Sequence, residues 1–377
     1  MNGIYYYLIA FAVIWILALS LKGKLSKHGF EIEFPIIMWK TQKLRGFISK
    51  LANLSPKFWK WYMNFGIVIS FGAMVFISYL MISTLPSVFE TPSVSLVIPG
   101  VEMPGSSIYV PFLSGFIALA TVLIVHEFSH GIQAVCEKIP IKSIGLLLFI
   151  ILPGAFVEPN EEKLKESDKI SQLRVYGAGS MANMTLALIA ILIFMLCTAS
   201  VSTFFTDDGV EISRIVSDGP SNGILKEGMI IESIGGHEIH TANDYSSFIG
   251  SFSPGDNVSV KTNQGTYTIT LDENPTNHSR GYFGIQSMNH YVLSNDSLGQ
   301  LPWILFSLIE IFQWIFTLNL GIGMFNLLPI KPLDGGKMLE ILLSYKLPEN
   351  QYKPLVNSIS AVFAIIIIFS LIAGFLV

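Results

Sequence analysis

Three residues in the second quarter of the chain have the types and spacing of a hydrolytic metal site. His126, Glu127 and His130 lie in the segment LIVHEFSHG, Leu123 to Gly131. On a helix His126 and His130 are one turn apart on the same face, so both imidazoles can bind one metal ion. Glu127 is adjacent and can accept a proton from water at that metal. The pattern predicts a metal centre with Glu127 as its base.

A zinc centre of this kind needs a third protein ligand, which the same helical turn cannot supply. The candidate is Asp334, in the segment NLLPIKPLDG that runs from Asn326 to Gly335. Its two prolines end a helix, and Gly335 permits close backbone approach. A buried carboxylate beside an apolar run needs a partner, and a divalent cation is one. We expect Zn2+ on Asp334 and the two histidines; the alternative is an aspartate that only caps a turn.

The composition places these residues in a membrane protein. The 377-residue chain is 51% hydrophobic and 13% charged, whereas soluble domains carry about 25% charged residues. No charge occurs from Pro111 to Val125, directly before the histidines. The net charge of −4 does not indicate a basic surface for nucleic acid, and two cysteines make no disulfide framework.

Apolar runs long enough to span a bilayer predict about six transmembrane helices. They are Ile4 to Leu21, Phe65 to Ile82, Pro111 to Val135, Val175 to Thr198, Pro302 to Leu328 and Pro354 to Val377.

The charges of the loops predict the orientation of these helices. Leu21 to Trp61 carries nine Lys or Arg, Leu85 to Val110 carries none, and Glu137 to Arg174 is again lysine-bearing. Ala199 to Leu301 has four basic and twelve acidic residues. By the positive-inside rule, the basic loops are cytoplasmic and Ala199 to Leu301 is extracytoplasmic. The chain is therefore expected in a cell membrane, with the metal site toward the cytoplasm.

One apolar segment is too short to be a comfortable span. Ile141 to Phe156 is interrupted by glycine and proline, and its β-branched residues and phenylalanines favour an extended hairpin. We expect a re-entrant β-hairpin close to the metal. A short amphipathic piece on the cytoplasmic side is the alternative.

The extracytoplasmic segment is polar and strand-like. Val258 to Lys261 and Thr266 to Leu271 alternate around Asn263 to Gly265, which predicts a hairpin. With Gly219-Pro220 and Pro254-Gly255-Asp256, the segment resembles PDZ domains associated with bacterial and archaeal proteases. That resemblance implies binding of peptide ends by strand addition; a β-rich cap without a ligand is the alternative.

Taken together, the metal motifs resemble those of the site-2 protease family of intramembrane metalloproteases. The matching patterns are the His-Glu-x-x-His motif and Asn326-x-x-Pro329-x-x-x-Leu333-Asp334-Gly335, supported by Pro153 to Glu158 and Gly179-x-x-x-Asn183, although Ser180 stands where many members carry proline. The resemblance implies zinc-dependent proteolysis of transmembrane protein substrates within the lipid bilayer.

The resemblance also implies that Asn183 and Asn326 contact the substrate backbone or stabilise the oxyanion. Amide side chains in apolar spans are costly unless they form hydrogen bonds. Hydrogen bonding between helices is the alternative for both.

The expected fold is thus a polytopic α-helical membrane protein with about six transmembrane helices, a re-entrant β-hairpin and an inserted extracytoplasmic PDZ-like α+β domain. The expected segments are 1–110 with two helices and a basic loop, 111–204 as catalytic membrane core, 205–290 as the PDZ-like domain, 300–340 with the second metal motif, and 341–377 as the last helix. Two other functions remain open: a catalytically silent scaffold that binds peptides, and a metal transporter or sensor.

Overall fold

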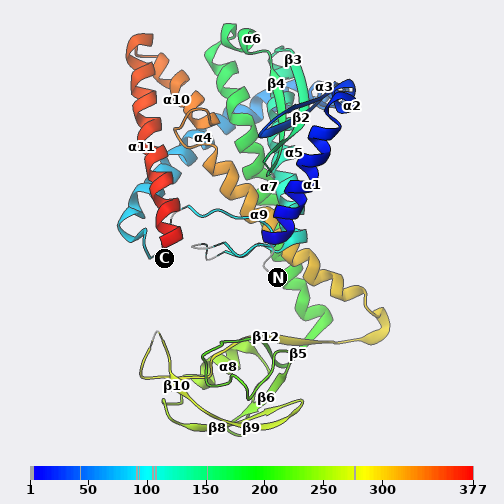
Figure 1. Cartoon of the computed structure of the whole chain (residues 1–377), viewed down its shortest axis with the longest axis vertical. Coiled ribbons are helices and arrows are strands. Elements are labelled where there is room, and N and C mark those ends of the chain that lie inside the picture. Colours follow the sequence, from blue (N-terminus) through cyan, green and yellow to red (C-terminus); the bar gives the residue numbers. More distant parts are fainter. Residues whose placement is uncertain are drawn as a thin grey trace. The chain divides into compact units, whose positions relative to one another are not determined.

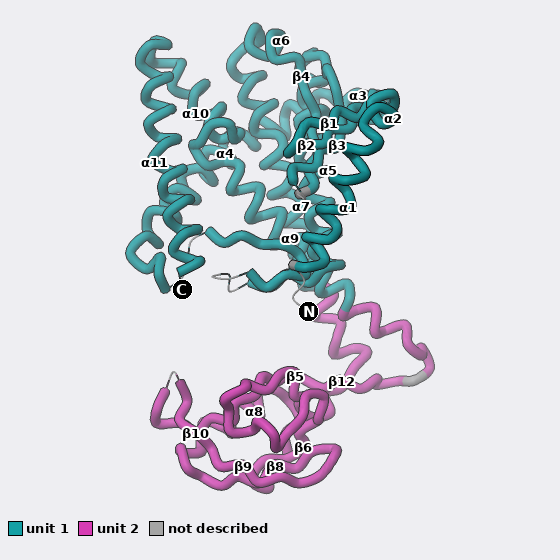
Figure 2. Tube along the Cα trace, viewed as in Figure 1, with its two compact units in different colours: residues 1–195, 307–377 teal, residues 196–306 magenta. Residues whose placement is uncertain are grey.

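The computed structural model describes residues 4–42, 44–90, 92, 94–103, 106, 108–150, 152–275 and 277–376. The chain forms two compact units, residues 1–195 with 307–377 and residues 196–306 (Figure 2). We name them the helical unit and the inserted domain.

Long helices make up most of the helical unit (Figure 1). The helices that lie in it or extend from it are α1 (Ile4–Ser20), α2 (Lys22–Leu25), α3 (Arg45–Leu54), α4 (Pro56–Ser83), α5 (Phe112–Cys136), α6 (Glu161–Glu166), α7 (Lys169–Phe204), α9 (Ile304–Phe325), α10 (Asp334–Ser344) and α11 (Glu349–Leu376). Short 3-10 turns occupy Ser26–His28, Leu85–Ser87, Asp296–Leu298 and Leu301–Trp303.

Five of the described helices are long and apolar enough to cross a bilayer: α4, α5, α7, α9 with its preceding turn, and α11. This is the pattern of a polytopic membrane protein. The first expected span differs, because α1 ends at Ser20 and the chain then bends by 71° before Lys22–His28. Only as a bent pair do these two segments make a sixth span. Several other helices extend beyond their apolar runs, since helical hydrogen bonding continues into the polar flanks, as at Pro56 in α4 and Lys169 in α7.

The expected hairpin is present as part of a larger sheet. β3 (Ile141–Phe149) and β4 (Leu152–Pro159) pair antiparallel, with Gly145 opposite Phe156. β1 (Phe30–Glu33) and β2 (Ile36–Thr41) add to the β3 side, which gives the order β1-β2-β3-β4. β4 is therefore an edge strand of this sheet.

Apolar packing holds the sheet against α5, the helix that carries His126 and His130. Ile144 of β3 and Val157 of β4 are buried against Ile132 of α5 and Ile48 of α3. Each such side chain contributes about 1.5–3 kcal/mol when fully buried. Gly131 of α5 allows this approach, because a Cβ added there would lie 3.0 Å from Val157 Cγ1.

The inserted domain is a small unit whose described strands surround one short helix, α8, with the ends of α7 and α9 at its two junctions. Its main sheet has the order β12-β5-β6-β8-β9, with β7 beside β6, and a separate pair is β10-β11. The elements are β5 (Phe205–Ile215), β6 (Ile230–Ile234), β7 (His237–Glu238), α8 (Ala242–Ile249), β8 (Asn257–Thr262), β9 (Gly265–Thr270), β10 (Asp272–Glu273), β11 (Gly281–Tyr282) and β12 (Ile285–Leu293). The hairpin expected around residues 263–265 is confirmed, with Thr262 opposite Gly265.

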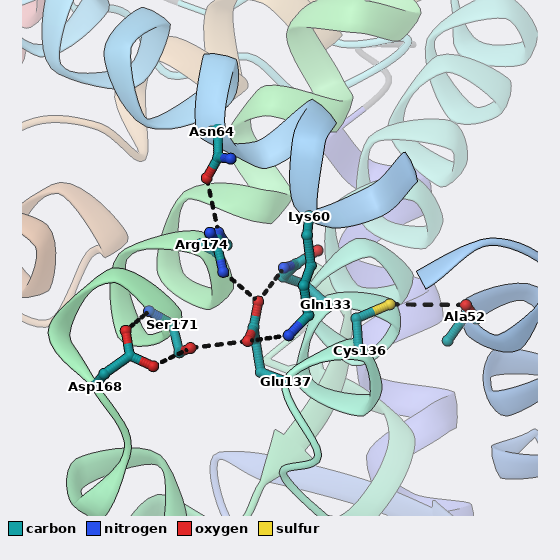
Figure 3. Close-up of polar contacts among 9 residues, drawn as sticks. All are labelled: Ala52, Lys60, Asn64, Gln133, Cys136, Glu137, Asp168, Ser171 and Arg174. Atoms are coloured by element: carbon teal, nitrogen blue, oxygen red, sulfur yellow. Dashed lines mark hydrogen bonds and ion pairs between the residues drawn. The ribbon is translucent and has the colours of Figure 1, made fainter. Parts of the chain in front are cut away.

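A buried ion-pair cluster joins three helices at the end of α5 (Figure 3). Glu137, whose side chain is 3% exposed, lies 2.8 Å from Lys60 Nζ of α4 and 3.0 Å from Arg174 Nη1 of α7. Ser171 Oγ and Gln133 Nε2 also lie within 3.0 Å of its carboxylate. Burial on its own raises the pKa of Glu137, but the hydrogen bonds from Lys60, Ser171 and Arg174 hold that pKa below its ordinary value. The cluster thus fixes α5 relative to α4 and α7.

Replacing Glu137 by Gln is expected to destabilise the helical unit by on the order of 2 kcal/mol, because Lys60 and Arg174 keep their charges without a carboxylate. Thermal unfolding of the detergent-solubilised chain measures the loss. Since the folded pKa is lowered, the Glu137 contribution is present above about pH 4.5 and is lost as the pH falls through the folded pKa. Glu137→Gln should lack this part of the pH dependence.

Glu166→Gln is the matched control, because the Glu166–Lys163 pair is exposed and such pairs contribute at most about 1 kcal/mol. Equal destabilisation by the two variants would contradict a structural role for the buried cluster.

Candidate metal centre

The two histidines of α5 direct their Nε2 atoms toward a common point. His126 Nε2 and His130 Nε2 are 3.2 Å apart, as expected for residues one helical turn apart. His130 Nδ1 lies 2.7 Å from the carbonyl oxygen of Val175 in α7. That contact places a proton on Nδ1, and the lone pair of His130 Nε2 is then free to bind a metal.

Asp334 meets both histidines from the first position of α10. Its Oδ2 lies 3.3 Å from His126 Nε2 and 3.2 Å from His130 Nε2. The loop before α10 folds tightly, since the Gly335 N–H donates to the Asn326 carbonyl oxygen at 2.9 Å. A Cβ at Gly335 would lie 2.1 Å from the Leu327 carbonyl oxygen, so the expected close backbone approach is confirmed.

The donor set fits a divalent metal ion. The three ligand atoms of His126, His130 and Asp334 lie within 4.8 Å of one another. Each side chain is only 12% exposed. Two imidazole nitrogens and one carboxylate oxygen are ligands typical of a hydrolytic zinc site. The structure therefore brings together the three residues that the sequence suggested.

Gly179 of α7 provides the space in which the imidazoles lie. A Cβ added at Gly179 would be 2.5 Å from His130 Nε2 and 2.7 Å from His126 Nδ1. Real Cβ atoms do not approach neighbouring atoms so closely. The glycine of the Gly-x-x-x-Asn pattern thus lets the α7 backbone pack directly on both ligands.

Glu127 lies in the same cavity as the ligand atoms. The cavity has a volume of about 240 Å3 and is lined by His126, Glu127, His130, Val157, Pro159, Glu161, Leu164, Val175, Tyr176, Asn326, Pro332, Leu333, Asp334 and Lys337. Glu127 Oε2 accepts a hydrogen bond of 2.9 Å from the backbone N–H of Val157 in β4. Edge strand β4 therefore orients the predicted base.

The two predicted asparagines take different positions. Asn326 lines the metal cavity. Asn183 is fully buried in α7, and its side-chain amide contacts His126 Nδ1 at 3.3 Å. The structure therefore places Asn326 within reach of a molecule in the cavity, and Asn183 behind a histidine.

Sequence reasoning missed several residues of the cavity wall. Lys337 lies one turn after Asp334, and its Nζ is 4.9 Å from the centre of the Tyr176 ring. The i, i+3 spacing from Asp334 is a signal that could have identified Lys337. Val157 and Val175 contribute through backbone atoms, for which side-chain type gives no signal.

Fold and site together define a helical membrane protein with a metallopeptidase-type centre. The chain belongs to Peptidase family M50, whose sequence profile matches residues 114–367. This match, together with the relatives below, confirms the resemblance to site-2 proteases that the two metal motifs indicated.

Two relatives show how far the similarity extends. An uncharacterized protein of Methanocaldococcus jannaschii is 31% identical over 227 residues, which cover 60% of this chain and 56% of that protein. The membrane-bound transcription factor site-2 protease homolog of Arabidopsis thaliana is 25% identical over 175 residues, 45% of this chain and 33% of the relative. The chain thus spans about half the length of the first relative and a third of the second.

Two solved structures resemble a smaller part of the chain. The PDZ domain of an SdrC-like protein from Listeria monocytogenes is 24% identical, with a TM-score of 0.20, and the match covers 22% of this chain and 90% of that domain. For the PDZ domain of the SdrC-like protein from Listeria innocua, the identity is 26%, the TM-score 0.20 and the coverage 22% and 97%.

Replacing Gly179 by Ala is expected to abolish stoichiometric zinc binding, because the new methyl group would displace the imidazole rings. Metal analysis of the purified, zinc-loaded chain measures the effect. Gly72→Ala in α4 is the matched control, since a Cβ there would have no neighbour within 4 Å. Full zinc content in Gly179→Ala would show that the glycine is not needed for the ligand geometry.

Proposed function

We propose that the chain is an intramembrane zinc endopeptidase that cleaves transmembrane protein substrates, as in regulated intramembrane proteolysis. The observation that carries the proposal is that Asp334 of α10 converges on His126 and His130, which lie with Glu127 in a helix apolar enough to span a bilayer. Membership of Peptidase family M50 supports the same reaction class.

The residues of the site have distinct roles in this reaction. When bound, zinc supplies Lewis-acid chemistry that polarises a carbonyl and lowers the pKa of a water molecule. Glu127 accepts the proton of the attacking water and then gives it to the leaving amine. Asn326, in the wall of the cavity, donates a hydrogen bond to the oxygen that gains charge at the scissile carbonyl.

The proposed orientation has six spans, with the bent α1 segment as the first. With spans that alternate in direction, the proposal puts the lysine-bearing loops and the end of α5 on one side of the membrane, and the segment Ala199 to Leu301, with four basic and twelve acidic residues, on the other. The positive-inside rule then places the metal centre toward the cytoplasm. Water reaches it from that side, whereas the hydrocarbon core excludes water.

Edge strand β4 is the proposed binding site for the substrate backbone. A peptide bond within a helix has its carbonyl hydrogen-bonded, so the substrate must be extended before cleavage. Val157 directs its N–H away from β3, to Glu127. Alternate residues of a strand face the same edge, so Ala155 directs its N–H there as well. An apolar cavity of about 740 Å3, lined by parts of α1, α5 and the sheet, adjoins Ala155.

The inserted domain is the proposed site for peptide ends. Its sheet, with α8 beside it, offers the edge-strand mode of recognition, in which an added strand supplies backbone hydrogen bonds. A scaffold without catalysis would need only this domain, whereas the base beside three convergent ligand atoms serves hydrolysis.

Replacing Glu127 by Gln is expected to lower cleavage by about 10²–10⁴-fold while zinc remains bound, because the variant keeps the shape of the side chain and loses its basicity. The assay compares wild type and variant on a synthetic transmembrane substrate in detergent. Equal cleavage by the two proteins would refute the mechanism, and no cleavage by zinc-loaded wild type would favour the scaffold.

Replacing Ala155 by Pro is expected to reduce cleavage at least about tenfold, because it removes a backbone donor from the free edge of β4. Ala155→Val is the matched control, since valine keeps the N–H and favours strands. The measurements are cleavage rate and zinc content. If Ala155→Pro cleaves at the wild-type rate, the substrate does not add to this edge.

A further inference from the structure

We infer that Asn183 is a positioning residue for the metal ligand His126: its side-chain oxygen accepts a hydrogen bond from His126 Nδ1–H and thereby fixes the tautomer in which Nε2 binds the metal. The inference rests on the metal site of the proposed function and changes the role that the sequence suggested for Asn183.

The location of Asn183 separates it from the substrate. Asn183 is fully buried, and it is absent from the wall of the cavity that Asn326 helps to form. Gly323 of α9 packs against it, since a Cβ added at Gly323 would lie 3.0 Å from Asn183 Cβ. A substrate in the metal cavity therefore meets Asn326, whereas Asn183 meets His126.

The proton on His126 determines which amide atom must face it. His126 Nε2 points to His130 Nε2 and Asp334 Oδ2, at 3.2 and 3.3 Å. To bind a metal, this nitrogen must be unprotonated, and a neutral imidazole then carries its proton on Nδ1. Nδ1 is therefore a donor and needs an acceptor.

Asn183 can supply that acceptor without any movement of the backbone. Its Nδ2 lies 3.3 Å from His126 Nδ1, and its Oδ1 is buried without a hydrogen-bond partner. Rotation of the amide by 180° exchanges these two atoms within the same shape. Asn183 Oδ1 then accepts a hydrogen bond from His126 Nδ1–H. The buried oxygen gains a partner, and Asn183 Nδ2, a donor, no longer faces the donor Nδ1–H.

The face of α7 that carries Asn183 serves both histidines. Val175, Gly179 and Asn183 follow one another at intervals of four residues, so they lie on one side of the helix. The carbonyl oxygen of Val175 contacts His130 Nδ1 at 2.7 Å, and Gly179 provides the space for both rings. With Asn183 as acceptor for His126, α7 fixes the tautomer of each histidine.

The experiment measures the zinc affinity of the purified full chain in detergent, by competition with a chromophoric chelator. Asn183→Leu, which has no acceptor, should lower zinc affinity about 10–100-fold. Asn183→Asp, which offers only acceptors to Nδ1–H, should keep or raise the affinity. The absorption spectrum of the Co2+-loaded protein should change with Asn183→Leu and remain close to wild type with Asn183→Asp.

Asn319→Leu is the matched control. Asn319 is equally buried and also has an Oδ1 without a partner, but its amide contacts Thr121 of α5 rather than a histidine. This control should bind zinc as wild type does. Size-exclusion chromatography shows which variants are folded.

Two results would overturn the inference: wild-type affinity in Asn183→Leu, or equally weakened affinity in Asn183→Asp. If the leucine variant does not fold, the aspartate variant decides. Zinc binding is read without proteolysis, so a wild type that binds zinc but cleaves nothing refutes the proposed function and leaves the role of Asn183 standing.

Discussion

The structure depends on the cost of bringing two imidazole nitrogens and a carboxylate oxygen together where they are largely buried from water. The lone pairs of His126 Nε2, His130 Nε2 and Asp334 Oδ2 converge at separations of 3.2–3.3 Å. Without a cation, such an arrangement leaves polar atoms facing one another away from water. With a cation, the same convergence is favourable, and burial strengthens it because water competes less. The convergence therefore suits a bound metal, and it needs a scaffold rigid enough to hold the ligands.

Three parts of the helical unit supply that rigidity. The backbone of α7 packs on the imidazoles where Gly179 has no side chain. The turn before α10 is tight enough that Gly335 contacts the backbone of residue 327. Beyond the histidines, Glu137 joins α5 to α4 and α7 through Lys60 and Arg174 (Figure 3). Each connection restrains a different degree of freedom: the approach of α7, the position of Asp334, and the rotation of α5.

The sequence predicts those features that depend on side-chain type at short spacing. The histidine pair, the neighbouring glutamate and the glycines after Asp334 all follow from local pattern. The addition of β1 and β2 to β3 was not predicted, because Trp39 pairs with Leu146 more than a hundred residues away. Contacts through the backbone, such as the carbonyl oxygen of Val175 on His130, are independent of side-chain identity. The role of Asn183 also needed coordinates, since a buried asparagine fits a substrate contact and a helix contact equally well.

The hydrogen bond between Val157 and Glu127 connects two requirements of the proposed reaction. Proteolysis within a bilayer needs an extended substrate and a correctly directed base. The N–H of Val157 lies on the edge of β4 that an added strand would use, and this N–H holds one oxygen of Glu127. A substrate strand on that edge would therefore run directly beside the base, with no further movement needed to bring the two together. The second oxygen of Glu127 stays available for the proton, because Val157 binds only Oε2. Backbone recognition of this kind reads no side chains, so selectivity among substrates would come from other features, such as the apolar cavity beside Ala155.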